Sequence, residues 1–436
     1  MEYSLMLQVT VALPSGKRKC LTVPQSATVR DLKLLAQTTF CRGVLRLVSA
    51  AGQVLRNLEE PLQTAGVQEG DCLTAVAPPA NIAATRKVSM YTNEGGFALW
   101  CCGGDHLISW GSADVQVEDV FEDVQKTQAT CVSFAALLSD KSVVAWGCIR
   151  DGGDSSEVED ELTDVQHIQA TISAFAAIRS DGSVITWGSP FEGGDSSQVQ
   201  SQLKNVQHIQ ATQTDFAAIL SDGSVVTWGN PYHGGDSSEV QSRLRNVQHT
   251  QATSGAFAAI LSEGLVVTWG DSDCGGDSSE VQSRLKNVQH IQATEHALAA
   301  ILSDGSVVTW GNPYHGGDSS EVQSRLRNVQ HIQATFGAFA AILSDGSVVT
   351  WGNPYHGGDS SEVQSRLRNV QHIQATFSAF AAILSDGSVV TWGNPYRGGD
   401  SSDVQNRLRN VQHIQATFSA FAAILSDGSV VTWGGF

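Results

Sequence analysis

Ser221-Asp222-Gly223-Ser224-Val225-Val226-Thr227-Trp228-Gly229 is the stretch that decides the fold, because close copies of it recur along most of the chain. An Asp-Gly pair before a short apolar segment is typical of a β-hairpin turn, since both residues tolerate positive φ. The Trp-Gly pair recurs every 41 residues at Trp146, Trp187, Trp228, Trp269, Trp310, Trp351, Trp392 and Trp433, and Trp110-Gly111 precedes them at a shorter interval. A fixed period of this length indicates a repeat architecture.

Each repeat contains short β-prone segments joined by Gly-rich turns. In the unit that contains Trp228, residues 206–212, 216–220 and 225–228 are predicted strands. Asp236-Ser237-Ser238-Glu239 has the spacing of a helix cap, so residues 240–244 form either a helical turn or a short fourth strand. Short strands at this period predict a propeller blade, with the Trp filling the wedge between neighbouring blades.

The repeat also resembles a known family. Ala-Ala-Ile-Leu followed by Asp-Gly-Ser-Val-Val-Thr-Trp-Gly is similar to the repeat of the regulator-of-chromosome-condensation family over about residues 88–434. The units are short for that family and closer to the compact blades of the β-lactamase-inhibitor propeller. The resemblance implies an all-β propeller of seven or more blades of about 41 residues. Because nine such hairpins occur, an open β-superhelix is the alternative.

The first 78 residues have a different pattern. A hairpin at 5–23, a helix at 29–36 and strands at 45–48, 52–55 and 71–77 are expected. This order resembles ubiquitin, which implies an α+β β-grasp domain. In ubiquitin an apolar patch contacts receptors, and the resemblance places Val48 and Val76 in that patch. No Gly-Gly pair follows the last strand, which indicates a built-in domain rather than a released modifier.

These patterns predict a ubiquitin-like domain at 1–78, a linker at 79–87 and a repeat propeller at 88–436. With 41% hydrophobic and 16% charged residues, the composition is that of a soluble globular protein. The net charge is −18 and the acidic excess lies in the repeats, which argues against binding to nucleic acid. Scattered cysteines without a CxxC motif favour the cytoplasm or nucleus. No apolar run or leader pattern predicts a membrane segment.

Differences between the repeats cluster in two loops. One precedes the Phe-Ala-Ala strand and the other follows Trp-Gly, so antiparallel strands place both loops on one face. Loops on rigid scaffolds commonly carry binding, and aromatic side chains are favoured at interfaces. The alternative is simple drift in tolerant loops. The candidate protein-binding residues are Phe191, Tyr232, His233, Tyr314, His315, Phe336, Tyr355, His356, Phe377, Tyr396 and Arg397, together with Val48 and Val76.

Enzyme chemistry finds no support in the sequence. No catalytic set, phosphate loop or metal-ligand spacing stands out from the repeats, so no catalytic residue, cofactor or metal is expected. The leading hypothesis is a non-enzymatic adaptor, in which the ubiquitin-like domain contacts ubiquitin-pathway machinery and the propeller captures a partner protein. The alternatives are a guanine-nucleotide exchange factor for a small GTPase, implied by the family resemblance, and a propeller-type enzyme inhibitor.

Overall fold

The computed structural model describes residues 6–13, 17–40, 46–55, 57, 60–76, 80–84, 96–101, 107–111, 124–427 and 429–435. The N-terminal region is a mixed four-stranded sheet with one helix, in the strand order β2-β1-β4-β3. Its elements are β1 (Met6–Ala12), β2 (Arg18–Pro24), α1 (Val29–Phe40), β3 (Arg46–Val48) and β4 (Cys72–Val76). Strand β1 is antiparallel to β2 and parallel to β4.

The helix begins where the sequence predicts it. The Thr28 backbone N–H donates to Asp31 Oδ2 at 2.8 Å, and the Asp31 N–H lies 3.4 Å from Thr28 Oγ1, which is a reciprocal cap. The expected strand at 52–55 is reduced to a single bridge between Val48 and Val54. The predicted hairpin, helix and outer strands are therefore present, and the ubiquitin-like interpretation of this sheet stays a prediction.

The expected linker at 79–87 is wrong in part, because it contains a strand. Strand β5 (Ala80–Ala84) pairs antiparallel with β6 (Gly96–Cys101), and β6 pairs with β7 (Leu107–Gly111). The first repeat therefore starts before residue 88. Its first strand, Ala-Asn-Ile-Ala-Ala, lacks the Val-Gln-His-Ile pattern of the later copies, which is why the sequence did not reveal it.

Eight further sheets follow, each of three antiparallel strands. Their strands are β8 (Val124–Ala129), β9 (Ser133–Leu138), β10 (Val143–Gly147), β11 (Val165–Ala170), β12 (Ala174–Arg179), β13 (Val184–Gly188), β14 (Val206–Ala211), β15 (Asp215–Leu220), β16 (Val225–Gly229), β17 (Val247–Ala252), β18 (Ala256–Leu261), β19 (Val266–Gly270), β20 (Val288–Ala293), β21 (Ala297–Leu302), β22 (Val307–Gly311), β23 (Val329–Ala334), β24 (Ala338–Leu343), β25 (Val348–Gly352), β26 (Val370–Ala375), β27 (Ala379–Leu384), β28 (Val389–Gly393), β29 (Val411–Ala416), β30 (Ala420–Leu425) and β31 (Val430–Gly434). The segment expected to be a helical turn or a fourth strand is a 3-10 turn in the fourth repeat, η5 (Gln241–Arg243).

Asp236 also differs from its expected role. Its Oδ1 accepts the Ser238 N–H at 2.8 Å, which makes a local turn. The cap position of η5 is Val240, which has no side-chain cap bond. The carboxylate therefore shapes the loop after Trp228 rather than capping the turn that follows.

The hydrophobic cores lie between consecutive sheets. One core joins Ile178 of β12 with Trp228 of β16 and Phe216 of β15. The rings of Phe216 and Trp228 stack at 5.2 Å, and the indole N–H donates to the Gly193 carbonyl of the preceding repeat at 3.0 Å. The same indole bond to the preceding repeat recurs, and its Trp residues therefore fill the wedge between two blades, as the sequence predicts: Trp187, Trp269, Trp310, Trp351, Trp392 and Trp433.

A β-bulge explains the surface of the first strand in each sheet. The pairing of β14 with β15 shifts register between Val206 and His208. The extra residue leaves Gln207 and His208 both exposed, between buried Val206 and Ile209, where regular alternation would bury one of the two. The repeated His is therefore a surface residue of the innermost strand.

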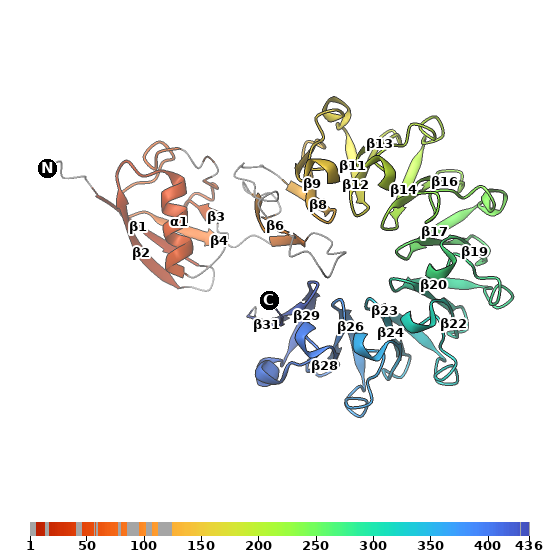
Figure 1. Cartoon of the computed structure of the whole chain (residues 1–436). Coiled ribbons are helices and arrows are strands. Elements are labelled where there is room, and N and C mark those ends of the chain that lie inside the picture. Colours follow the sequence, from red (N-terminus) through yellow and green to blue (C-terminus); the bar gives the residue numbers. More distant parts are fainter. Residues whose placement is uncertain are drawn as a thin grey trace.

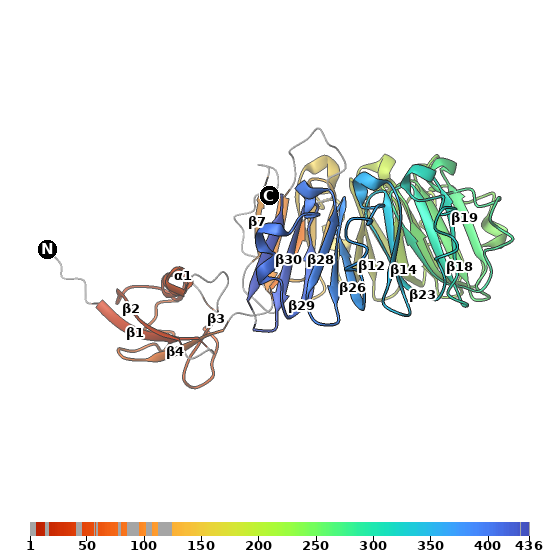
Figure 2. The same ribbon diagram turned by 90° about the horizontal axis from the view of Figure 1, so that it is seen from below.

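The sheets are arranged around a common axis, with the first strand of each sheet nearest to it (Figure 1). Seen at 90°, the sheets lie at one level, and the short helical turns gather along one edge of the array (Figure 2). These are blades of a mostly β repeat structure. The number of blades that close a ring stays a prediction.

Candidate functional site: the divergent loop face

The loops before the middle strands are joined from blade to blade by backbone hydrogen bonds. The Gln213 N–H donates to the Ser254 carbonyl at 2.9 Å, and the Phe336 N–H donates to the Phe377 carbonyl at 2.9 Å. We call these half-buried positions the inner row: Cys131, Ile172, Gln213, Ser254, Glu295, Phe336, Phe377 and Phe418. Because backbone atoms make these bonds, the side chain at each position can vary without disturbing the loop.

Three of the eight positions of the inner row are aromatic. The ring centres of Phe336 and Phe377 are 4.3 Å apart, and those of Phe377 and Phe418 are 4.4 Å apart. The loop after Trp-Gly contributes His356, whose ring centre lies 5.2 Å from that of Phe336, and Arg397, which covers two of the rings. The aromatic cluster, as named here, consists of Phe336, Phe377, Phe418, His315, His356 and Arg397.

Charge in the aromatic cluster is set by burial. Burial, and next the nearby positive charge of His315, lowers the pKa of His356, whose Nδ1 lies 2.8 Å from Ser378 Oγ. Burial also lowers the pKa of Arg397, which nevertheless remains a cation at neutral pH. The cluster therefore presents the permanent positive charge of Arg397 over the rings of Phe377 and Phe418.

Three consecutive positions of the inner row are polar, namely Gln213, Ser254 and Glu295. The Gln213 side chain donates to the carboxylate of Glu295, two blades away. Ser254 Oγ and Cys274 Sγ lie 3.1 and 3.0 Å from His296 Nδ1. Substitutions on a fixed backbone have thus given the same face an aromatic sector and a hydrogen-bonded sector.

A buried carboxyl group lies beneath this polar sector. Asp215 Oδ2 accepts the Thr212 hydroxyl at 2.6 Å and lies 3.2 Å from Thr214 Oγ1. Burial raises the pKa of Asp215 to about 6, against the opposing effects of these hydroxyls and of His233. The neighbouring repeats have Ala174 and Ala256 at this position. The charge is therefore peculiar to one blade.

A row of exposed rings lies in the loops that follow Trp-Gly. In the turn η7 (Pro313–His315) the Asn312 side chain accepts the Tyr314 N–H at 2.9 Å, and the turn ends at Gly316 with φ of 94°. This geometry leaves the second turn residue outside the core. The ring residues and their exposed fractions are Phe191 at 86%, Tyr232 at 84%, Tyr314 at 80%, Tyr355 at 82% and Tyr396 at 85%.

Most of the predicted site residues therefore fall on one face. The structure brings Phe336, Phe377, His315, His356 and Arg397 together. His233 is bonded instead to Thr214, with Nδ1 3.2 Å from the hydroxyl. The repeated turns Ser-Asp-Gly-Ser lie at the other ends of the strands, as the antiparallel pairing requires.

The remaining predictions lie elsewhere or were missed. Val48 is half-buried in β3 of the N-terminal sheet, and Val76 pairs with Arg46 through the backbone, while the Val76 side chain lies outside the described part. Phe418 was missed, although it occupies the position of Phe336 and Phe377 in the last repeat.

The described residues contain neither a metal-binding group nor a membrane-spanning helix. No group of three or more His, Cys, Asp or Glu side chains there is placed to hold a metal ion. Within the same residues, no helix has the length and apolar character that crossing a membrane requires.

No protein-family model matches the chain, and no curated protein sequence matches it. Solved structures do match, at low identity. The ectodomain of the receptor kinase CR4 from Physcomitrella patens has a TM-score of 0.38 and 14% identity, covering 63% of this chain and 74% of that one. Prp20p from Saccharomyces cerevisiae has a TM-score of 0.38 and 17% identity, covering 64% and 82%. The designed protein Ika8 has a TM-score of 0.34 and 14% identity, covering 72% and 96%. Because these TM-scores are below 0.5, the likenesses say nothing of partner or activity.

Proposed function

We propose that the chain is a non-enzymatic protein-binding scaffold whose divergent loop face captures a partner protein. The observation that carries the proposal is the aromatic cluster. Three half-buried Phe rings contact one another in a row, tilted by 32° and 38° between neighbours, and a guanidinium lies over two of them. Aromatic residues and Arg are enriched at interfaces and dominate binding energy there.

The contrast between the two ends of the blades supports this proposal. The turns at the other end repeat one internal bond, such as Ser347 Oγ to Asp345 Oδ1 at 2.6 Å. The loop face changes from Gln213 to Glu295 to Phe377 at equivalent positions. A surface that differs from blade to blade can recognise an asymmetric partner, whereas a uniform one cannot.

For the N-terminal residues 1–78 we propose a ubiquitin-like domain that contacts ubiquitin-pathway machinery, in the cytoplasm or nucleus. Its strand order, with β1 between β2 and β4 and a helix after the hairpin, is compatible with a β-grasp. Val48 lies on the edge strand β3 and is partly exposed. This part rests on the sequence resemblance.

The second candidate is a guanine-nucleotide exchange factor for a small GTPase. The sequence resemblance implies it. The matched protein Prp20p is described as binding Gsp1p and histones. A further matched structure is that of Kap60 bound to yeast RCC1 (Prp20). An enzyme inhibitor is the third candidate and differs from the adaptor only in its partner.

One set of baits tests the binding face. The full chain is compared with Phe377→Ser/Arg397→His, which installs the residues already present at Ser254 and His356, and with Ser347→Leu, which copies Leu265 on the opposite end. Quantitative proximity labelling should show partners lost only from the loop-face variant. Equal partner lists for all three baits would refute the proposed face.

Two further measurements separate the candidates. A bait without residues 1–78 should lose proteasome or ligase components if the N-terminal domain is the adaptor arm. Nucleotide release from a Ras-like GTPase should be unchanged by the full chain. Stimulated nucleotide release would refute the adaptor hypothesis and support the exchange-factor hypothesis.

A further inference from the structure

Equivalent grooves lie between consecutive blades, next to the exposed rings. Four successive grooves have cavity volumes of about 790, 750, 760 and 810 Å³. Their shared lining is the loop after Trp-Gly in one blade and the Trp strand with the Asp-Ser-Ser segment of the next. The grooves therefore form a periodic series along the outer part of the loop face.

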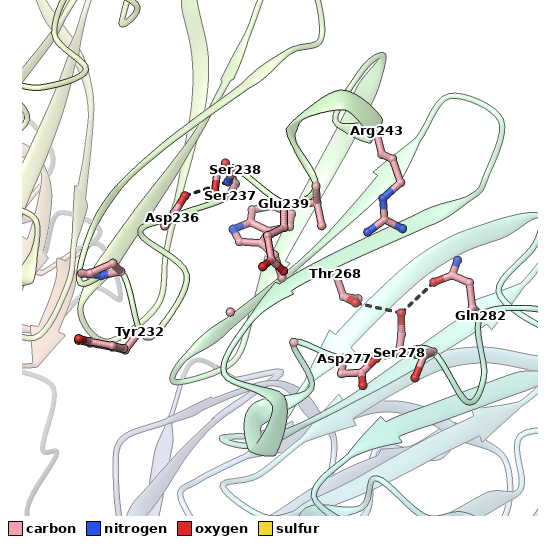
Figure 3. A pocket seen from close by; sticks show the side chains of 16 residues that line it. Tyr232, Asp236, Ser237, Ser238, Glu239, Arg243, Thr268, Asp277, Ser278 and Gln282 are labelled. Atoms are coloured by element: carbon pink, nitrogen blue, oxygen red, sulfur yellow. Dashed lines mark hydrogen bonds between the residues drawn. The ribbon is translucent and has the colours of Figure 1, made fainter.

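The groove lined by Tyr232 shows the common design (Figure 3). Tyr232 and Arg243 stand at opposite ends of the lining, with Asp236 and Glu239 between them in this view. Asp277 comes from the next blade. The exposed ring and the carboxylates thus line one groove.

The neutral polar groups of the groove are already bonded to one another. Thr268 Oγ1 lies 2.9 Å from Ser278 Oγ, which donates to Gln282 Oε1 at 2.9 Å. The Gln282 amide donates in turn to the Val266 carbonyl at 3.0 Å. These bonds fix the floor of the groove, so the carboxylates and the ring are the groups that face a ligand.

Every groove has an excess of negative charge. Asp236, Glu239 and Asp277 face one Arg243 in the groove of Figure 3, and the next two grooves repeat this set. The groove beside Phe191 has Asp195 and Asp236 and no cationic side chain in its lining. Each groove therefore has two more carboxylates than cations, in a chain of net charge −18.

We propose that the grooves bind an extended Lys- or Arg-rich segment of a partner protein, one cationic side chain in each groove. The inference rests on the proposed protein-binding function and names the chemistry of the partner. A cation gains both from a carboxylate and from the face of an aromatic ring. A single exposed groove binds weakly, and several grooves on one chain act together through effective concentration.

The chain contains its own test of the aromatic contribution. One groove lies beside η6 (Ser272–Cys274), where Asp273 stands at the position of Tyr232. The Asp273 N–H donates to Asp271 Oδ1 at 2.9 Å, as the Tyr232 N–H does to Asn230 Oδ1 at 3.0 Å. The same side-chain-to-backbone bond holds both turns, so Asp273→Tyr should fold as its neighbours do.

The experiment uses the full chain and fluorescent peptides of equal length that alternate Lys or Glu with Ser. Fluorescence anisotropy should show binding of the Lys peptide, a Kd that rises with salt, and no binding of the Glu peptide. Tyr232→Ala and Tyr314→Ala should each raise the Kd by about two- to fivefold, the range for an exposed cation–π contact. Asp273→Tyr should lower the Kd by a similar factor, although it removes a carboxylate.

Equal binding of the two peptides would overturn the proposal, and so would weaker or unchanged Lys binding by Asp273→Tyr. The proposed function can fail independently of the grooves. Phe377→Ser/Arg397→His should lose partner proteins. If Tyr232→Ala and Tyr314→Ala keep those same partners, the groove proposal is refuted and the proposed binding face is not. If the chain binds the Lys peptide but Phe377→Ser/Arg397→His loses no partner, the groove proposal stands and the proposed binding face fails.

Discussion

The guanidinium carbon of Arg397 lies 4.4 Å from the centre of the Phe418 ring. It also lies 5.0 Å from the centre of the Phe377 ring, so one cation covers two neighbouring aromatic side chains. The equivalent position in the preceding repeat is His356. A substitution at the end of the repeat series has thus placed a permanent charge on the loop face.

Arg397→His should weaken partner capture while changing the free energy of unfolding by no more than about 1 kcal/mol, the value of an exposed cation–π contact. The fold tolerates His here, because His356 occupies the same turn in the neighbouring blade. Urea unfolding and quantitative capture measure the two effects. The matched control is Arg368→His, which removes an exposed Arg away from the rings and should leave capture unchanged. Equal loss of capture by both variants would show a general charge effect instead.

Asp215→Ala should change how stability depends on pH. The folded pKa of Asp215, about 6, is above its usual value of 3.8, so the native state favours the protonated carboxyl. Wild-type stability therefore falls as pH rises from about 4 to about 6 and is level above that range. Relative to wild type, the Ala variant should gain roughly 3 kcal/mol across this window, at about 1.4 kcal/mol per pKa unit.

Chemical unfolding at a series of pH values measures this difference. Asp222→Ala is the control with the opposite sign, because hydrogen bonds from Ser224 lower the pKa of that exposed carboxyl. The ionised Asp222 carboxylate stabilises the wild-type fold above the usual Asp pKa, and this stabilisation is lost as pH falls. If the free energy of unfolding depends on pH in the same way for wild type and Asp215→Ala, the raised pKa of the buried Asp215 carboxyl is contradicted.

Gly193→Ala should destabilise the repeats by about 2–4 kcal/mol, the sum of backbone strain and overpacking. Gly193 has φ of +96°, and an added Cβ would lie 2.6 Å from Phe216 Cδ2. Calorimetry should show the loss as a lower Tm. Gly337→Ser is the matched control, because the next repeat has Ser378 there and the nearest atom to an added Cβ is a His356 side-chain carbon at 3.2 Å. Equal Tm values for the two variants would contradict the prediction, because they would show that the Phe216 ring moves away from an added Cβ at little cost.

Val48→Lys should abolish binding of ubiquitin-receptor peptides without altering capture by the repeats. A charge on the edge strand β3 would disrupt the apolar receptor surface that we propose at Val48, while the buried core around Leu47 stays intact. Titration of the full chain with such peptides measures the effect. Identical titration curves for wild type and variant would refute the receptor binding that we propose for residues 1–78.

Much of the repeat could be predicted from sequence because its signals are local. The Asp-Gly turn, the Trp-Gly spacing and the alternation of strands and loops locate β14, β15 and β16 to within a residue or two. Strand β5 was missed because it shares no motif with the later copies. The register shift at His208 was also unforeseen, since a bulge has no composition of its own here.

The site was predictable only in part because it depends on contacts between repeats. Aromatic residues in variable loops pointed to Phe336, Phe377 and Tyr232. The bonds that align the inner row join residues 41 positions apart, as between Phe377 and Phe418, and no local pattern reports them. The spacing of Asp236 and Glu239 predicts a helix cap. The sequence of one repeat does not show that residues of the next blade complete a groove around these carboxylates.

The central claim is that the divergent loop end of the blades, and not the Asp-Gly turn end, meets the partner. Hydrogen–deuterium exchange of the full chain, free and bound to a partner recovered by capture, tests it most directly. The account predicts slower exchange in the loops around Gln213, Phe336 and Phe418 and no change in the turns at Asp222-Gly223 and Asp345-Gly346. Protection confined to those turns would contradict it.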